Sequence, residues 1–409
     1  MHTQKHFYKI IFALFIVLSA CTNNTNQEAI FTVEEAKESL LVAENHYLKL
    51  AETLNDSVLP RTTGSVGELE TSNIYWWTSG FYPGTLWYLY EYTGNDTLKE
   101  EAEQKTNLLE PLKEYPFTHD LGFMVFCSYG NAYRITGNSD YKEIIIEAAE
   151  TLASRYNDTI KTIKSWDWNR DGEWQFPVII DNMMNLEMLT WAAHQSDNKK
   201  LEDVANIHSK TTIENHFRED FSTYHVVDYD TITGQARGRM THQGYSDESA
   251  WARGQAWGLY GYVMMFDETG DSIYLNQAQE IADFILEHEN LPEDKIPYWD
   301  FNAPDIPDAL RDASAGAIIA SALLELSTFT TDTTQAKYLE NAETMLATLS
   351  SDNYLAEPGS NNNFILKHSV GHLPGESEVD VPLTYADYYY VEALLRFLEL
   401  KGDFSFEDY

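Results

Sequence analysis

The sequence predicts an all-α protein built as an (α/α)6 barrel, a closed ring of six helix hairpins. Helical periodicity runs through most of the chain, and no long stretch alternates apolar and polar residues as a strand would. Short turn motifs separate the helices. They are TGND at 93–96, TGNS at 136–139, QSDN at 195–198, ETGD at 268–271, TTDT at 330–333 and KGD at 401–403.

The helices on the two sides of these turns differ in character. Those before a turn are apolar nearly all round, as in LGFMVFCSYGNAYRI, and those after it have one charged face. A helix that is apolar on every side is buried, so the apolar helices form an inner ring and the amphipathic helices an outer ring. An open solenoid would also show repeats, but it would leave one face of most helices wet. No linker rich in Pro, Gly or Ser follows residue 33, so residues 33–409 are predicted to be one catalytic domain.

Residues 1–20 have the pattern of a signal peptide. Lys5 and His6 precede an apolar run that ends in small residues directly before Cys21. The sequence LSAC resembles the bacterial lipobox, in which the cysteine becomes the lipidated first residue of the mature chain. An ordinary secretory signal and a short membrane anchor are the alternatives. Residues 21–32 then form a polar tether, and Thr22 after the cysteine indicates the outer membrane by resemblance to lipoprotein sorting rules.

Composition limits the partners. The formal net charge is −38, which excludes nucleic acid because phosphate binding needs a basic footprint. A small anionic substrate needs only a local cationic pocket. Aromatic residues make up 13% of the chain, which suits a large helical core or a carbohydrate cleft. Besides Cys21 only Cys127 is present, predicted to be a small core residue. No metal-ligand spacing or phosphate-binding glycine loop is evident, so no cofactor is predicted.

Two carboxylates begin or interrupt apolar inner helices. Asp120 opens the run HDLGFMVF, and Asp181 lies inside FPVIIDNMMNLEML. Apolar surroundings raise the pKa of a carboxyl group, as a general acid requires, and two carboxylates in one cleft suit glycoside chemistry. The alternatives are structural. For Asp181 they are a cap or a buried carboxylate bonded to backbone. For Asp120 the alternative is a helix N-cap, and we expect both roles together, because a cap at this position would fix Asp120 at the mouth of an inner helix, facing the cleft. His119 beside it is predicted to be an orienting or structural neighbour.

A second cluster lies within 242–262, HQGYSDESAWARGQAWGLYGY. Trp251 and Arg253 bracket a helix start, Trp257 lies one turn beyond, and Gln243 is just upstream. An arginine between rings offers a fork for a carboxylate, and the rings offer stacking faces for a sugar.

Three further segments are weaker candidates. SWDWNRDGEWQFP at 165–177 carries Trp166 and leads into Asp181, which predicts either a rim over the cleft or a packed hydrophobic flap. Trp77 could form the floor of a sugar-binding subsite, or it could be a core residue that fills the end of the barrel. His225 is a lone histidine of the kind that is more often structural. The polar loop 368–382 is a candidate to close the cleft.

Five motifs, in order, resemble the unsaturated glucuronyl hydrolases of glycoside hydrolase family 88. The resemblance extends from about Trp76 to Arg396. The motifs are WTSGFYPGTLWYLYE, HDLGFMVF, IIDNMMNLEML, HQGYSDESAWARGQAWGLYG and EVDVPLTYADYYYVEALLR.

The resemblance implies an (α/α)6 barrel and a hydrolase for oligosaccharides that polysaccharide lyases leave with a 4,5-unsaturated uronic acid at the non-reducing end. It implies that Asp181 protonates C4 of the double bond and then activates water for addition at C5, and that Asp120 is the second carboxylate. The positions that match contacts to the uronate are His225, Gln243 and Arg253. Those that match its aromatic wall are Trp77, Trp166, Trp251 and Trp257.

One loop departs from the family 88 pattern, and two other functional assignments stay open. Where members that prefer sulfated substrates carry a lysine, the loop reads HSVGHLPG, with Leu373 and Pro374. Chondroitin, heparin, xanthan, gellan and ulvan fragments all stay open as substrates. The nearest rival is the unsaturated rhamnogalacturonyl hydrolase family, family 105, although SAWARGQAW and YADYYYVEALLR favour family 88. A rival of another class is a non-catalytic, glycan-binding outer-membrane lipoprotein.

Overall fold

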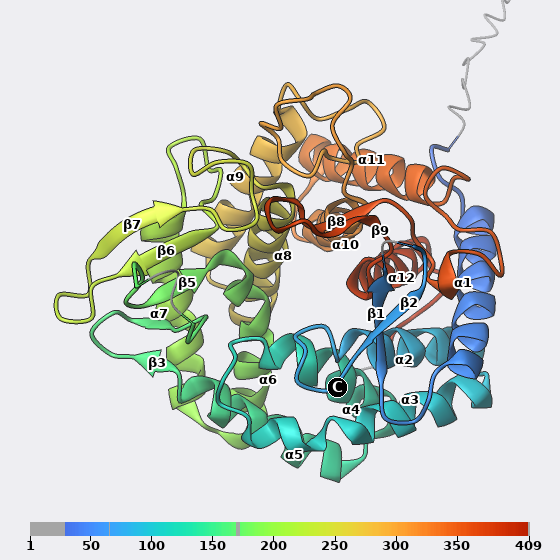
Figure 1. Cartoon of the computed structure of the whole chain (residues 1–409), viewed down its shortest axis with the longest axis horizontal. Coiled ribbons are helices and arrows are strands. Elements are labelled where there is room, and N and C mark those ends of the chain that lie inside the picture. Colours follow the sequence, from blue (N-terminus) through green and yellow to red (C-terminus); the bar gives the residue numbers. More distant parts are fainter. Residues whose placement is uncertain (1–28, 65, 169–171, 408–409) are drawn as a thin grey trace, which may run out of the picture.

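The fold was analysed in a computed structural model that describes residues 29–407, except residue 65 and residues 169–171. The signal sequence, Cys21 and most of the tether lie outside the described residues. Within the described part, helices form two concentric rings, which confirms the predicted (α/α)6 barrel (Figure 1). The outer ring consists of α1 (Val33–Thr53), α3 (Asp96–Leu108), α5 (Ser139–Ala153), α7 (Lys199–His216), α9 (Ser272–Glu287) and α11 (Asp332–Leu349).

The inner ring holds the apolar helices. Two of them begin irregularly: a π-helix leads into α4, and a 3-10 helix leads into α6. The ring consists of α2 (Phe81–Thr93), η2 (Gly122–Gly130) with α4 (Asn131–Thr136), η3 (Ile180–Asn185) with α6 (Leu186–Ser196), α8 (Ala252–Thr269), α10 (Ala313–Thr328) and α12 (Thr384–Lys401).

The recurring turn motifs form the tight corners from an inner helix to the next outer one. Gly94 ends α2 with φ of 67°, a left-handed conformation that glycine adopts without strain. The side chain of Asn95 then accepts a hydrogen bond from the backbone N–H of Thr97 and caps α3. Gly137 and Asn138 repeat this arrangement between α4 and α5.

The ring closes where the last inner helix packs on the first outer helix. Phe31 and Phe397 place their ring centroids 5.1 Å apart, and Lys37 pairs with Asp403 at 2.7 Å. Deeper in the contact between α1 and α12, Tyr47 donates a hydrogen bond to a buried carboxylate, Asp387 of α12, at 3.2 Å. Residues at the two ends of the domain thus form one hairpin-like pair.

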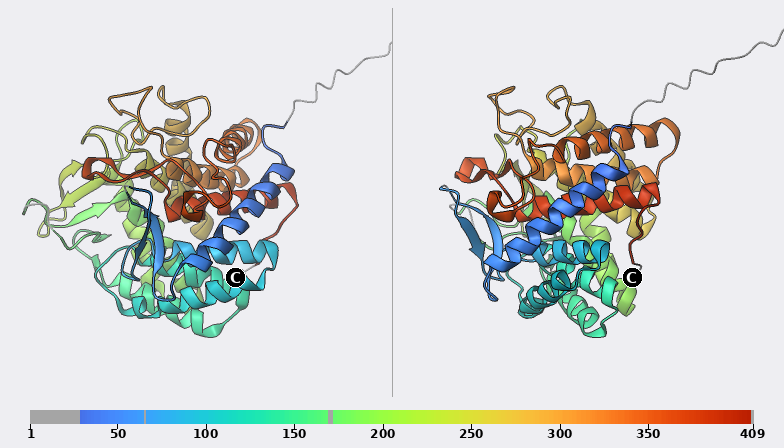
Figure 2. Two further views of the ribbon diagram at one scale, coloured as in Figure 1. Left: turned by 45° about the vertical axis from the view of Figure 1, so that its right-hand side comes forward. Right: turned by 90° about the vertical axis from the view of Figure 1, so that its right-hand side faces the viewer.

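Nine short strands in the described residues form four small antiparallel sheets, all in connections that lead from an outer helix to the next inner one. They gather at one end of the barrel (Figure 2). Strands of two to five residues are too short for alternation to be recognised in a sequence. The two-stranded sheets are β1 (Leu59–Thr63) with β2 (Leu69–Ser72), β3 (Tyr156–Asn157) with β4 (Thr162–Ile163), and β8 (Ser369–His372) with β9 (Ser377–Val381). In the three-stranded sheet, β6 (Val226–Tyr229) lies between β5 (Pro177–Ile179) and β7 (Ala236–Met240).

Gly80, at the start of α2, permits a close approach between two inner helices. A methyl group there would fall inside the van der Waals radii of the carbonyl oxygens of Phe123 and Met124. We expect Gly80→Ala to lower the free energy of unfolding by about 1–3 kcal/mol, because backbone atoms cannot move aside cheaply. Gly258→Ala is the matched control, since its nearest neighbours would lie 3.6 Å away or more. Alanine favours the helix there, so thermal denaturation should show an unchanged or higher melting temperature. Equal losses in both variants would contradict this account.

Candidate active site

A cleft of about 310 Å³ opens at the end of the barrel where the inner helices begin. Its walls come from the sheet-bearing connections and from the first turns of the inner helices. It brings together six of the residues singled out in the sequence: Trp77, Asp120, Trp166, Asp181, Gln243 and Arg253. The 165–177 segment contributes Trp166 and Trp168 to the cleft, as expected for a rim, while Trp174 is buried against Trp166 at a ring separation of 5.5 Å.

Asp181 lies in the first turn of η3, directly after strand β5, and is 7% exposed. Its Oδ2 is buried and accepts no hydrogen bond from any described residue. Burial raises the pKa of Asp181 to about 7, the positive charge of Arg253 lowers it, and the carboxylate of Asp120 raises it again. The prediction of a carboxyl group with a raised pKa is confirmed.

Asp120 lies in the turn before η2, and its side chain does not cap the helix, so the predicted N-cap is wrong. The helix begins instead with a backbone hydrogen bond, in which the carbonyl of Asp120 accepts the N–H of Met124 at 2.9 Å. The carboxylate is thereby left to face the cleft, where it accepts a hydrogen bond from the hydroxyl of Thr118 at 2.7 Å. Burial raises the pKa of Asp120 to about 7, while Thr118 and Arg155 lower it.

A neutral imidazole lies beside each of the two carboxyl groups, and the two rings carry their hydrogen on different nitrogen atoms. His119 places Nδ1 3.0 Å from the carbonyl of Ser165, so Nδ1 carries the hydrogen and Nε2 presents a lone pair 3.2 Å from Asp120 Oδ1. Burial lowers the pKa of His119 to about 3, which keeps the ring neutral. That lone pair can accept a hydrogen bond only from the protonated form of Asp120.

His225 has the other tautomer. Its Nδ1 accepts the backbone N–H groups of His242 and Gln243, both at 3.1 Å, so the hydrogen sits on Nε2. This N–H lies 3.8 Å from Asp181 Oδ2, beyond hydrogen-bond length. Burial lowers the pKa of His225 well below its usual value. The ring packs against Trp251 behind the cleft wall, with ring centroids 4.5 Å apart and the two planes tilted by 36°.

Arg253 is 1% exposed and lines the cleft, and its Nε has no hydrogen-bond partner among the described residues. Its predicted contact with a substrate carboxylate stays a prediction. The Nη1 and Nη2 atoms of Arg253 donate to the carbonyls of Val370 and Gly371 at 2.5 and 2.7 Å, and Nη1 also pairs with Asp312 at 3.3 Å. The guanidinium therefore holds the β8 strand against the barrel. Its charge still acts in the cleft, because it lowers the pKa of Asp181.

Trp251 and Trp257 lie beneath the surface of the cleft. Trp251 immediately precedes α8, as expected, and packs under the Arg253 guanidinium at 4.5 Å. Trp257 is fully buried and contacts Phe123, with ring centroids 5.1 Å apart. Both tryptophans thus support the wall from behind.

No group of three or more metal-ligating side chains occurs among residues 29–64, 66–168 and 172–407. In the same ranges, no helix combines the length and apolar character needed to cross a membrane.

Known sequences and structures place the chain in a family. The sequence profile of Glycosyl Hydrolase Family 88 matches residues 50–399. The chain belongs to this family. An unsaturated glucuronyl hydrolase of Formosa agariphila is 50% identical over 321 residues, 78% of this chain and 79% of the relative. One from Bacillus sp. strain GL1 is 33% identical over 78% of this chain and 85% of the relative.

Solved structures agree with this family 88 assignment. An unsaturated glucuronyl hydrolase specific for heparin superposes with a TM-score of 0.88 at 48% identity, over 91% of this chain and all of the other. A variant of the Streptococcus agalactiae enzyme, complexed with dGlcA-GalNAc6S, superposes with a TM-score of 0.78 at 29% identity, over 91% and 93% of the two chains.

Sequence reasoning missed several residues of the family 88 cleft. Arg61 of β1 places its guanidinium 4.1 Å from the ring centroid of Trp76 and donates to Glu378 of β9 at 2.6 Å. His372 lies nearby and contacts the backbone carbonyl of His242 at 3.0 Å. Several of the missed residues had a signal: His119 adjoins Asp120, His242 adjoins Gln243, Trp168 lies in the 165–177 segment, and His372 lies in the 368–382 loop. The further lining residues that were not predicted as catalytic or substrate-binding residues are Arg61, Trp76, His119, Trp168, Ile179, His242, His372, Ser377 and Glu378.

Proposed function

We propose that this family 88 enzyme removes the 4,5-unsaturated uronic acid from the non-reducing end of lyase-generated oligosaccharides by hydrating the vinyl-ether double bond. The observation that carries the proposal is the pair Asp181 and Asp120, a buried and a partly buried carboxyl group in one cleft, both with a pKa raised to about 7. The substrate's double bond is the product of β-elimination, so polysaccharide lyases must supply it. Family 88 membership and the named relatives favour this activity over rhamnogalacturonyl hydrolysis or glycan binding without catalysis.

The reaction begins with proton transfer to carbon. The protonated carboxyl of Asp181 donates to C4, and positive charge develops at C5 and the ring oxygen. Ionised Asp120 stabilises that charge electrostatically in a site largely closed to water. A water molecule then adds at C5 and gives its proton to the Asp181 carboxylate, which restores the acid. The hemiketal at C5 opens the ring, and the hemiacetal left at C1 releases the remaining saccharide.

We infer that the surrounding residues bind and orient the sugar. Trp77 and Trp166 offer ring faces in the cleft, and Gln243 is fixed by its own hydrogen bond to the carbonyl of Gly371 at 3.0 Å. Arg253 attracts the uronate by its charge. The imidazole of His225 holds Gln243 and His242 in place through their backbone N–H groups.

The test follows the ultraviolet absorbance of unsaturated disaccharides, because the conjugated enoate absorbs and its hydrated product does not. We expect the absorbance to decay with the wild-type enzyme. A panel with different aglycones, with and without sulfate, would then define the preferred polysaccharide. An unchanged absorbance with every unsaturated uronide would refute the proposal.

The pH profile should be bell-shaped, because the active form holds one proton on the Asp181–Asp120 pair. Above the higher of the two apparent pKa values both groups are ionised, and no acid remains. Below the lower value both are protonated, and the developing charge lacks its carboxylate. We expect kcat/KM measured from about pH 5 to about pH 9 to peak near neutrality and fall on both sides. A profile that rises steadily through alkaline pH would contradict a carboxylic acid as proton donor.

We also propose that Cys21 is lipidated and anchors the enzyme to the outer membrane. The support is the LSAC sequence at the end of an apolar run, followed by the tether and then by α1 at Val33. Expression of the full chain should place the enzyme in the detergent-extractable membrane fraction, and Cys21→Ala should leave it uncleaved and without lipid. Equal detergent partitioning and lipid labelling of both forms would contradict lipidation at Cys21.

A further inference from the structure

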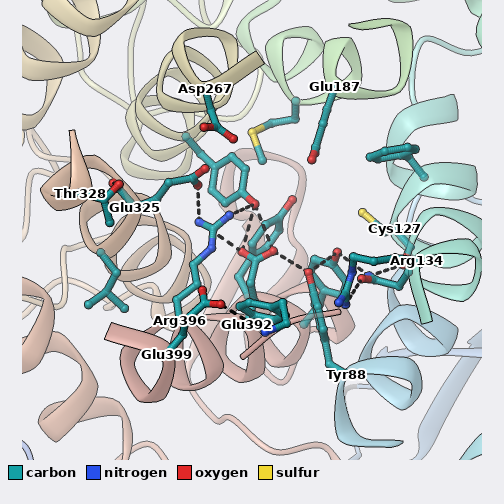
Figure 3. Close-up of a pocket in the computed structure, with 18 of the residues that line it drawn as sticks. Tyr88, Cys127, Arg134, Glu187, Asp267, Glu325, Thr328, Glu392, Arg396 and Glu399 are labelled. Atoms are coloured by element: carbon teal, nitrogen blue, oxygen red, sulfur yellow. Dashed lines mark hydrogen bonds and ion pairs between the residues drawn. The ribbon is translucent and has the colours of Figure 1, made fainter. Parts of the chain in front are cut away.

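A second cavity lies at the opposite end of the barrel from the catalytic cleft. It encloses about 410 Å³ and is lined by the later turns of the inner helices, including Asp267 of α8, Thr328 of α10 and Glu399 of α12 (Figure 3). Residues nearer the starts of the inner helices, such as Gly122, Met184 and Glu187, also line it. The thiol-bearing Cys127, predicted as a core residue, is only partly buried and lines this cavity. The hydration mechanism uses none of these side chains.

The cavity carries an excess of negative charge. Two arginines line it, and both are engaged by the protein. Arg134 forms a two-point pair with Glu91 at 2.5 and 2.6 Å, and Arg396 pairs with Glu325 at 2.6 Å. Against these two cations stand six carboxyl residues in the lining: Glu187, Asp267, Glu325, Glu392, Glu399 and Glu407.

The carboxylates of the cavity differ in their hydrogen-bond and ion-pair partners. Glu392 accepts hydrogen bonds from the hydroxyls of Tyr88 at 2.8 Å, Tyr260 at 3.1 Å and Ser321 at 2.6 Å, so its charge is accommodated. The carboxylate of Glu187 has no hydrogen bond or ion pair with any residue of the described chain, and only its backbone carbonyl accepts from a side chain, the hydroxyl of Thr190. Figure 3 shows Glu187 and Glu325 reaching into the space from different sides.

The environment of Glu187 opposes its ionisation. Burial raises its pKa well above the usual value, the nearby carboxylates Glu268, Glu325 and Glu392 raise it further, and the charge of Arg396 lowers it. Arg396 is paired with Glu325, so an ionised Glu187 has no ion pair of its own among the described residues and needs a further positive partner.

A second polar group in the cavity is also unpartnered. Tyr389 is 2% exposed, lines the cavity, and its hydroxyl makes no hydrogen bond with the described residues. The groups that act electrostatically on this hydroxyl are Cys127, Glu392, Glu187 and Tyr88, all of which line the cavity. Its ring packs edge-on against Tyr260 at 5.4 Å, which fixes its direction. A buried hydroxyl without a partner marks a place where a ligand can accept or donate a hydrogen bond.

We propose that this cavity binds a protonated amine with a small apolar body. An ammonium group donates three hydrogen bonds and supplies the positive charge that Glu187 lacks, with Tyr389 as a further acceptor. The aromatic side chains of Phe126, Phe329 and Tyr388 enclose the apolar part and present ring faces to the cation. The carboxylate excess disfavours an anion. A metal ion is disfavoured because the cavity's carboxylates do not converge as a ligand set.

Calorimetric titration of the whole enzyme at about pH 7 with benzylamine tests the proposal, with benzyl alcohol as a neutral probe of the same shape. We expect benzylamine to bind and benzyl alcohol to bind at least about tenfold more weakly. Glu187→Gln keeps the side chain's shape, removes its charge, and should weaken benzylamine binding at least about tenfold. Tyr389→Phe removes only the hydroxyl and should weaken binding less. Glu100→Gln, an equal charge change on exposed α3, should leave affinity unchanged.

Three outcomes would overturn the proposal: no binding of benzylamine, equal affinity for benzyl alcohol, or equal affinity of Glu187→Gln and wild type. A loss of binding in Asp120→Asn as large as in Glu187→Gln would place the amine in the catalytic cleft and would also overturn it. Melting temperatures report on folding separately. If Glu187→Gln does not fold, Tyr389→Phe with Glu100→Gln as control decides the question.

Discussion

Replacing Asp181 by asparagine lowers kcat for an unsaturated disaccharide by about a thousandfold. The amide matches the carboxyl group in shape but cannot donate a proton to carbon or take one back from water. KM should change little, because the cleft walls from Trp77 to Arg253 are untouched. The measurement is the initial rate of loss of enoate absorbance, at the pH optimum of the wild-type enzyme.

Asp387→Asn is the matched control for this variant. Burial raises the pKa of Asp387 to about 7 as well, but this carboxylate lies outside the cleft. It accepts the backbone N–H groups of Ile365 and Leu366 at 3.0 and 2.9 Å. We expect Asp387→Asn to lower the melting temperature and to leave kcat within about threefold, because losing hydrogen bonds to a buried charged group costs about 1–3 kcal/mol of stability. A kcat for Asp181→Asn above a tenth of the wild-type value would remove Asp181 from its role as the acid.

Replacing Asp120 by asparagine should lower kcat by about a hundredfold, through loss of the negative charge that stabilises the transition state. It should also move the alkaline limb of the pH profile to lower pH. Ionised Asp120 raises the pKa of Asp181, so its removal lets Asp181 lose its proton earlier. Both effects are read from kcat/KM of the residual activity across the pH range.

Thr118→Val provides a graded comparison at the same carboxylate. The Thr118 hydroxyl lowers the pKa of Asp120, so its removal should raise that pKa and move the acidic limb to higher pH, with only a modest loss of kcat at the optimum. If Asp120→Asn retained near wild-type kcat, or if both variants shifted the same limb, Asp120 would have only a structural role.

The fold could be predicted because it is encoded locally and repeated. Gly94 with Asn95 and Gly137 with Asn138 form the same corner, and the contrast between apolar and amphipathic helices assigns the two rings. The predicted capping role of Asp120 failed for a physical reason. The chain enters a π-helix whose backbone begins without a side-chain cap, and a sequence period of 3.6 does not reveal this.

The site was predictable only where its residues sit on inner helices or directly beside them. Asp181 and Arg253 stand out because a charged residue in an apolar run demands an explanation. Arg61 and Glu378 do not, because they are 317 positions apart on short strands whose register no local pattern specifies. The hydrogen bonds from Arg253 to β8 could not be predicted for the same reason, since their acceptors are backbone carbonyls more than a hundred positions away.

The packing of α1 on α12 also bears on how the protein folds. Phe31 meets Phe397, and Tyr47 meets Asp387, across more than three hundred positions of chain. The five corner hairpins between them are local and can form early, whereas the contact that completes the ring is the most distant one in the domain. Until the last helix arrives, the nascent chain is an open arc with the apolar faces of its inner helices exposed. Such a chain exposes apolar surface on which it can aggregate, and we expect its final docking step to limit the folding rate.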